Sequence, residues 1–594
     1  MMSSIRPLVY SSVAPTRQRF TFLKRLRIRP TIRRIRGINF SRNVARIPAS
    51  SPFEEDDEAI GHPPETLLHN QQPHRRRRFG GAVSYRQQIS EESTVTVTEG
   101  RVFDLPLLRL PPLPSPLPPL SQPGPPPSRQ VIETYTDFHQ AFESFSEKEK
   151  KARRRALSRL SVVGKTAERV REHPVLEVLH ARVRSQSQPG QRTDPYKIGL
   201  AIEGGGMRGA VSAGAAAAIN LLGLSDGFDA VYGSSAGALI AAFFVSGQLN
   251  GTIIYSDVLP AAGKRFLDRA QLIPAMGLLP GVEAKPVLNL QFLEDVIRNT
   301  VRLDWASFWA KNAVQPLNVV ASSLDGMESL ALRSDKGDFD SFESLIQCLK
   351  SSMCVPGVAG PPVFLNVTCR QTGERKERAF ADALVFEPIP LKSAVEDGCT
   401  HIVTLRTRPD GSEVLGHKVT GIYERFIARR FLADLHKFRP AAMHMTKFDH
   451  LRQYAADLLL LNEGSHAKAT GVHVPDGKGG GRAVHLLPVA PPMGTTEVDT
   501  LDSSREALRK GLKDGFAAAW NLMASPELAE VYPGEVVASE LFDCEDVETF
   551  DLTFKRFSTV FQGGIGQAEE NGLRATKQEQ LLFPRQGPHQ PRLA

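Results

Sequence analysis

Two short apolar runs, each followed by a helix-like segment, open the most regular part of the chain. Residues 197–203 (KIGLAIE) and 228–232 (FDAVY) are bounded by turn residues and have the length of buried strands. Residues 208–224 and 236–246 are rich in small and aliphatic side chains and contain no proline, which favours helices. A strand–helix–strand–helix order at this spacing predicts a parallel sheet of the α/β class.

Further apolar runs continue this pattern toward the C-terminus. We expect strands at 317–322, 379–382, 402–406 and 483–488, and helices at 342–352, 421–462 and 503–523. From about residue 526 the periodicity degrades, so residues 526–594 are predicted to be a largely disordered C-terminal extension. The predicted folded domain, residues 196–525, has three α/β/α layers around a mostly parallel central sheet.

The sequence before this domain divides into three segments by composition. Residues 1–52 contain 12 Lys and Arg and no acidic residue. Residues 53–130 form a proline-rich linker, predicted to be disordered, in which 11 of the 22 residues from 106 to 127 are proline. Residues 131–190 are dense in charges of both signs and are predicted to be a helical segment packed loosely on the domain.

The charge distribution changes what the net charge of +8 implies. Subtracting the 12 positive charges of residues 1–52 leaves −4 for the rest of the chain, so we expect no nucleic-acid partner. An Arg-rich, acid-free N-terminus predicts a transit peptide for a mitochondrion or plastid, with a basic tail on a cytoplasmic protein as the alternative. No run of about 18 apolar residues predicts a membrane span, so any membrane contact would be peripheral.

The pentapeptide Gly233-Ser234-Ser235-Ala236-Gly237 lies where the second predicted strand ends and a helix begins. In a nucleophile elbow, the central serine takes a strained conformation on such a turn, and the flanking Gly233 and Gly237 avoid Cβ clashes. The partial positive charge at the N-terminus of the following helix stabilises negative charge at the serine. The strand–turn–helix setting makes Ser235 a candidate nucleophile.

The segment Gly204-Gly205-Gly206-Met207-Arg208-Gly209 follows the first predicted strand and admits two interpretations. Its spacing matches the Gly-x-Gly-x-x-Gly fingerprint of dinucleotide-binding proteins, which also requires an acidic residue after the second strand. Ser235 follows that strand instead. Successive glycines leave backbone N–H groups free to converge on an anion, so an oxyanion hole is the favoured interpretation. Arg208 could add positive charge there or bind a lipid phosphate.

A serine nucleophile needs a base for its hydroxyl proton, and the residues alone leave the identity of that base open. The order Ser, Asp/Glu, His of α/β-hydrolases would draw on downstream histidines. The candidates are His401, His417, His436, His444, His450 and His466. None lies in a distinctive motif, and a lone histidine is more often structural or solvated than catalytic.

Taken together, these motifs resemble those of the patatin-like phospholipases. The resemblance rests on Gly204–Gly209, on Ser235 in Gly-x-Ser-x-Gly, and on Asp382 in Phe380-Ala381-Asp382. It extends to an acidic residue before the glycines, a serine-rich segment ending in proline, and the turn after the aspartate, which are Glu203, Ser351–Pro356 and Glu387–Pro390. The similarity covers roughly residues 196–409, with Met523 as its furthest limit.

The resemblance implies a patatin-like domain with a Ser–Asp dyad that works without histidine. Carried over by position, Ser235 is the nucleophile, Asp382 the base and Gly204–Gly209 the oxyanion hole. Desolvation would raise the pKa of Asp382 and make it a better base. The sequence departs from the family at Ala383, where the family has glycine, and a positive φ there would strain the turn by about 1 kcal/mol.

The expected activity is cleavage of acyl ester bonds in glycerolipids or phospholipids through an acyl-enzyme, as in a phospholipase A or a triacylglycerol lipase, without metal or organic cofactor. The substrate would lie in a membrane or lipid droplet. An acyltransferase or transacylase on the same dyad, and an inactive lipid-binding scaffold, are the alternatives. Apolar residues at helical spacing from Tyr423 to Phe438 fit an interfacial helix, although packing against the sheet is favoured. The sequence indicates no oligomeric state.

Overall fold

The computed structural model describes residues 129–564, with short gaps at 144–149, 167–172, 279–283, 369–372, 417–420, 434–435, 467–469, 476–479 and 545–546. The predicted transit peptide at 1–52, the proline-rich linker up to residue 128 and the C-terminal extension after residue 564 therefore lie outside the described residues. None of the helices in the described part of the chain is both long enough and apolar enough to cross a membrane.

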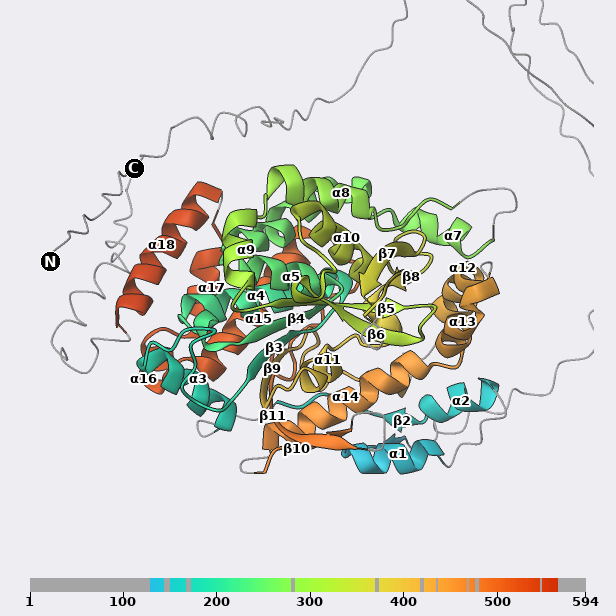
Figure 1. The fold of residues 1–594 in the computed structure, drawn as a ribbon, viewed down its shortest axis with the longest axis horizontal. Coiled ribbons are helices and arrows are strands. Elements are labelled where there is room, and N and C mark those ends of the chain that lie inside the picture. Colours follow the sequence, from blue (N-terminus) through green and yellow to red (C-terminus); the bar gives the residue numbers. More distant parts are fainter. Residues whose placement is uncertain are drawn as a thin grey trace, which may run out of the picture. The chain divides into compact units, whose positions relative to one another are not determined.

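Nine strands of the described residues form one sheet (Figure 1). In chain order they are β3 (Ile198–Ile202), β4 (Ala230–Ser234), β5 (Leu317–Ser323), β6 (Glu328–Leu332), β7 (Val363–Thr368), β8 (Arg375–Ala381), β9 (His401–Leu405), β10 (Val472–Pro475) and β11 (Gly481–Val489). Across the sheet they follow the order β10-β11-β9-β3-β4-β5-β8-β7, and β6 also pairs with β5. The neighbours from β11 to β5 are parallel and the outer pairings antiparallel, which confirms the predicted α/β class.

The central strands are apolar throughout because helices cover both faces of the sheet. In β3, Leu200 and Ile202 join the core on one face, whereas Ala201 joins the core on the other. The first core also holds side chains from α3 (Pro174–Arg184), α4 (Gly209–Leu221), α5 (Ala236–Val245), α6 (Leu259–Ala262), α7 (Leu272–Ala275), α8 (Leu290–Asp295), α9 (Trp305–Asn312), α10 (Phe342–Met353) and α15 (Arg505–Met523). The second holds side chains from α1 (Tyr135–Glu143), α2 (Lys150–Leu157), α11 (Leu391–Glu396) and α14 (Asp449–His466). The predicted three layers are therefore present.

Residues 421–462, predicted to be strongly helical, form a series of shorter elements. They comprise the π-helical turn η12 (Tyr423–Ala428), α12 (Arg429–Ala433), the 3₁₀ turn η13 (His436–Phe438), α13 (Arg439–Thr446) and α14. Pro440 stands in the first turn of α13, where its missing N–H is tolerated. Phe448, at φ 63°, ends the helical path between α13 and α14. Of the apolar stripe, Ile427 and Phe438 are buried, as the favoured core interpretation requires, but Phe426 is exposed.

The segment before residue 190 is more closely integrated with the sheet than the sequence analysis expected. Its strand β1 (Gln130–Val131) pairs with β2 (Leu160–Ser161), and Phe138 and Phe142 of α1 are buried in the second core. Leu179 of α3 is buried in the first core. The folded body thus begins well before the predicted boundary at residue 196, because the charged surface of this segment conceals a few aromatic and aliphatic anchors.

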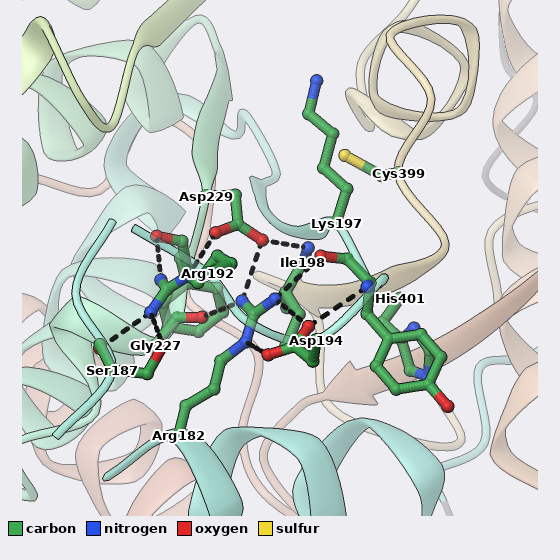
Figure 2. A network of polar contacts seen from close by, with 12 residues as sticks. Arg182, Ser187, Arg192, Asp194, Lys197, Ile198, Gly227, Asp229, Cys399 and His401 are labelled. Atoms are coloured by element: carbon green, nitrogen blue, oxygen red, sulfur yellow. Dashed lines mark hydrogen bonds and ion pairs between the residues drawn. The ribbon is translucent and has the colours of Figure 1, made fainter. Parts of the chain in front are cut away.

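A buried polar network ties α3 to the N-terminal ends of β3 and β4 (Figure 2). Arg182, in the last turn of α3, donates to Asp194 over 2.8 and 2.9 Å and to Asp229 over 2.8 Å. Arg192 donates to the other carboxylate oxygen of Asp229 over 2.6 Å, and the backbone N–H of Ile198 also donates to Asp229. The Arg182 side chain is only 2% exposed, so its charge is held by these partners rather than by water.

Residues 526–564 correct the expectation of a largely disordered C-terminal extension. They form α16 (Pro526–Val531), α17 (Gly534–Phe542) and α18 (Val547–Gly564). Trp520 of α15 and Phe561 of α18 have ring centroids 5.0 Å apart, and the tilted rings of Phe542 and Phe550 have centroids 6.1 Å apart. The aromatic residues Phe550, Phe557 and Phe561 of α18 are buried against α17, α4 and Trp520 of α15, tertiary contacts that the weak local pattern did not indicate.

Candidate active site

Ser235 lies on the turn between β4 and α5, at the carboxyl end of β4. Its φ of 53° and ψ of −123° are unusual for a residue other than glycine, and such a conformation costs roughly 1–3 kcal/mol. Tight packing holds the turn, since a Cβ on Gly233 would lie 2.5 Å from the Cα of Ala238. The Ser235 N–H donates to Oγ of Ser352, in the last turn of α10, over 2.8 Å. The serine side chain is thereby held at the carboxyl end of the central strand β4.

Asp382 follows β8, and its carboxylate lies against Ser235. The Ser235 hydroxyl donates to Oδ2 of Asp382 over 2.7 Å, and the Leu384 N–H donates to Oδ1 over 2.8 Å. The Asp382 side chain is buried. Burial raises the pKa of Asp382 to about 6, and the two hydrogen bonds lower it only in part. A carboxyl with this pKa is well suited to exchange a proton with a hydroxyl near neutral pH.

The residue after Asp382 does not strain the turn. Ala383 is buried and begins the 3₁₀ turn η10 (Ala383–Val385). It is not among the described residues other than glycine that have a positive φ. The alanine that replaces the family's glycine is therefore compatible with the backbone.

The glycine loop crosses in front of the same turn. The N–H of Gly204 donates to the carbonyl of Pro388 over 3.2 Å, and the N–H groups of Arg208 and Gly209 bond within the loop. The N–H groups of Gly205 and Gly206 donate to no acceptor in the described part of the chain. Gly206 has a φ of +60°, which turns the backbone where the two free donors occur. Of the predicted oxyanion-hole residues, these two have backbone donors available to a ligand.

Ser235, Asp382 and the glycine loop all line one cavity of about 940 Å³. Its wall is mostly apolar, with Leu259, Phe266, Leu272, Met276, Leu288 and Leu293 among its residues. Arg208, Arg408 and Tyr454 also line it and add polar groups. A cavity of this size and polarity suits a ligand with a long apolar chain and a reactive polar end.

The candidate histidines do not replace Asp382 as the partner of Ser235. No histidine in the described residues hydrogen-bonds to either side chain. His450 lines the cavity but pairs with Glu424 at 3.3 Å. His444 contacts the carbonyl of Val385 at 2.8 Å, and His401 stacks on His485. His466 ends α14, and the side chain of His436 and the whole of His417 lie outside the part of the chain that the structure describes.

Residues 200–395 match the family model described as patatin-like phospholipase. This segment, about a third of the chain, is similar to the patatin-like phospholipases. A comparison with curated proteins found no match. Among solved structures, the crystal structure of VipD from Legionella pneumophila is similar at 13% identity over 67% of this chain and 82% of that chain, with a TM-score of 0.29.

The matched segment holds Ser235, Asp382 and the glycine loop, but later residues also line the cavity. Arg408, Tyr454 and Thr500 line it, and all lie beyond residue 395. The Thr500 carbonyl accepts the N–H of Met207 over 3.1 Å, which fastens the glycine loop from outside the matched segment.

Several contacts that support the site were not predicted from the sequence, where Glu203 stands only as the acidic residue before the glycines. Glu203 accepts hydrogen bonds from the N–H of Thr407 over 2.6 Å and from the hydroxyl of Tyr454 over 2.7 Å. Ser352 was noted only as part of a serine-rich segment, without its contact to Ser235. None of the later residues lies in a local motif, so only the fold brings them to the glycine loop. Among the described residues, no group of three or more His, Cys, Asp or Glu side chains is placed to hold a metal ion.

Proposed function

We propose that the protein hydrolyses acyl ester bonds of glycerolipids or phospholipids, with Ser235 as nucleophile and Asp382 as base. The observation that carries this proposal is the 2.7 Å hydrogen bond from the Ser235 hydroxyl to a buried carboxylate at an apolar cavity of about 940 Å³. The strained turn, the raised pKa of Asp382 and the family match support it. Targeting to an organelle by residues 1–52 remains a separate proposal.

Acylation begins when Asp382 accepts the hydroxyl proton and Oγ of Ser235 attacks the ester carbonyl. The N–H groups of Gly205 and Gly206 stabilise the negative oxygen of the tetrahedral intermediate, aided by the N-terminus of α5. The carbon–oxygen bond to the alcohol then breaks, and Asp382 returns its proton to the leaving oxygen. In the second half, Asp382 takes a proton from water, which attacks the acyl-enzyme. The bond from the acyl carbon to Oγ of Ser235 then breaks, Asp382 returns the proton to Oγ, and the fatty acid leaves.

The apolar wall of the cavity favours substrates that carry long acyl chains. Acyl chains bury well against aliphatic and aromatic side chains, and each buried methylene contributes roughly 0.8 kcal/mol. Anchoring the chain in the cavity positions the carbonyl at Ser235, which favours esters with long acyl chains over short soluble ones.

Substitution of the dyad in the full chain tests this function. Ser235→Ala and Asp382→Ala are expected to lower kcat/KM on a panel of phospholipids, galactolipids and triacylglycerols by at least about 10³-fold. Ser235→Ala should also abolish covalent labelling by a fluorophosphonate probe. Ser307→Ala and Asp335→Asn, at exposed positions away from the cavity, are the matched controls and should retain activity and labelling.

The panel separates the alternatives. Activity that survives Asp382→Ala would transfer the base to another residue, and His450 would then be the first to substitute. Transfer of the acyl group to an added alcohol in preference to water would indicate a transacylase on the same serine. If the unmodified protein binds liposomes but neither hydrolyses lipids nor is labelled by the probe, the enzymatic proposal is wrong and a lipid-binding scaffold is favoured.

A further inference from the structure

Two arginines share one carboxylate at the polar end of the catalytic cavity. Nη1 of Arg208 lies 3.1 Å from Oε1 of Glu497, and Nη1 of Arg408 lies 3.5 Å from the same oxygen. The two side chains are 11% and 17% exposed, and both line the cavity that contains Ser235. Because a single oxygen lies within reach of both guanidinium groups, the two positive charges are close neighbours in a largely desolvated place.

This cluster has more hydrogen-bond donors than acceptors. Nε of Arg208, and Nε and Nη1 of Arg408, are buried without a hydrogen-bond partner among the residues that the structure describes. The nearby carboxylates are already engaged, since Glu203 accepts from Thr407 and Tyr454 and Asp499 accepts from the N–H of Leu501. The group that would complete the cluster is therefore an acceptor, and planar guanidinium forks favour an oxyanion.

The two guanidinium groups are held in place before any ligand binds. Arg408 stacks over the ring of Tyr454, 5.6 Å from its centroid, and the Tyr454 hydroxyl is fixed by Glu203. Arg208 folds back on its own loop, since a Cβ placed on Gly205 would lie 3.2 Å from Nε of Arg208. Burial, and then the charge of Arg408, lower the pKa of Arg208, whereas the pKa of Arg408 is raised because its burial is outweighed by Tyr454, Glu497 and Glu203.

We propose that Arg208 and Arg408 form a phosphate subsite that selects phospholipids over neutral glycerolipids. The proposal rests on the function proposed above, because it assigns the polar end of the same cavity. Arg208 belongs to the loop that carries the free N–H groups of Gly205 and Gly206, so the subsite adjoins the position of the reacting carbonyl. In a glycerophospholipid only a few covalent bonds separate the acyl carbonyl from the phosphorus, which matches two adjoining anion sites in one cavity.

Arg408 is the residue to vary, because its side chain is distinct from the glycine loop. Arg408→Gln in the full chain is expected to lower kcat/KM for phosphatidylcholine in mixed micelles of a non-ionic detergent by roughly 10- to 100-fold, mainly through KM. Diacylglycerol with the same acyl chains, and a p-nitrophenyl ester of the same acid, should change by less than about threefold. Arg408→Lys should recover part of the phosphatidylcholine activity, since it keeps the charge but loses the fork. Arg429→Gln, on the exposed surface of α12, is the matched control and should alter none of these values.

A binding measurement tests the subsite without turnover. Glycerol 3-phosphate is expected to raise the melting temperature of the unmodified protein and of Arg429→Gln, and to leave Arg408→Gln unchanged. An equal rise with inorganic phosphate, without any preference for phosphatidylcholine over diacylglycerol, would show that the arginines hold free phosphate and would overturn the headgroup assignment.

The outcomes also separate this proposal from the catalytic one. Hydrolysis of the p-nitrophenyl ester by the unmodified protein, with equal losses on all three substrates in Arg408→Gln, would give Arg408 a structural role and overturn the subsite while the dyad stands. No hydrolysis of any ester by the unmodified protein would reject the proposed function. The glycerol 3-phosphate shift and its loss in Arg408→Gln would then still decide the subsite, because an absent shift overturns it.

Discussion

The two ends of β3 and β4 carry polar groups that are organised in opposite ways. At the N-terminal ends, Arg182 and Arg192 meet Asp194 and Asp229 in a network whose charges all have close partners (Figure 2). At the carboxyl ends, Ser235 stands on a strained turn beside a carboxylate with a raised pKa. The glycine loop there leaves the N–H groups of Gly205 and Gly206 without acceptors in the described part of the chain. One end satisfies its buried polar groups, and the other leaves them ready for a ligand.

This contrast indicates that polar interactions stabilise the fold at the N-terminal ends of the two strands and not at their carboxyl ends. Ligands of open α/β sheets bind at the carboxyl ends of the strands, where loops can vary without disturbing the layers. Strain and desolvated charge at that end lower the stability of the folded state, and well-paired interactions elsewhere must offset them. In this chain the opposite ends of the same two strands supply such interactions.

The largest expected effect on stability is at the N-terminal ends. Arg182→Ala leaves Asp194 and Asp229 without their main buried counter-charge, and we expect the free energy of unfolding to fall by about 3–5 kcal/mol. Urea unfolding measures this loss. The exposed Arg159→Ala is the control, with a change within about 0.5 kcal/mol. A loss below about 1 kcal/mol, or lowered kcat/KM in protein that is still folded, would break the distinction between the two ends.

Asp382→Asn tests the opposite sign at the carboxyl ends. The pKa of Asp382 is raised to about 6 in the folded state, so its ionisation destabilises the fold as pH rises from about 4 through 6. Removing the charge should therefore increase the free energy of unfolding above pH 6 by on the order of 2–3 kcal/mol, with little gain at pH 4. Urea unfolding at pH 4 and pH 8 measures the difference, with Asp335→Asn as the control.

The same ionisation should govern activity. In the unmodified protein, kcat/KM is expected to rise with pH through about 6, because only the ionised Asp382 can accept the Ser235 proton. Asp382→Asn should be inactive although more stable. A stability gain that is equal at pH 4 and pH 8, or an activity profile flat through pH 6, would show that the carboxyl is not desolvated in this way.

The smallest expected effect concerns Ala383. Because its φ is not positive, glycine offers no relief of strain there and adds freedom to the unfolded chain. Ala383→Gly is expected to lower the free energy of unfolding by about 0.5–1 kcal/mol and to leave kcat/KM within about twofold. Thermal unfolding and the ester assay measure both values. A clear rise in activity would mean that the alanine restrains the dyad after all.

The sequence predicted those strands of the sheet that are buried on both faces. The runs that became β3, β4, β5, β9 and β11 are continuous and apolar, so local pattern was sufficient. The strands β6, β7 and β10 were missed because they are short or partly exposed and alternate weakly. The helices after residue 526 and the anchors before residue 190 depend on a few aromatic contacts with distant elements, which periodicity does not report.

The candidate site divides in the same way. Ser235 and the glycines lie in local motifs at strand ends, and Asp382 followed from the resemblance to a family. Ser352 contacts the serine turn through one hydroxyl, and Arg408 reaches the cavity only because β9 lies beside β3. The sequence around such residues contains no motif that indicates a role at the site, so only the folded structure shows that they belong to it.

The cavity is built by two stretches of chain that meet only in the folded protein. Residues 200–395 bring the reacting groups, and Arg408, Tyr454 and Thr500 complete the wall from outside that stretch. Under the proposed function, substitutions after residue 395 can alter which lipid is accepted while the serine turn stays untouched. Because the reacting groups and this part of the cavity wall come from different stretches of sequence, related genes can diverge in substrate preference without first losing the catalytic residues.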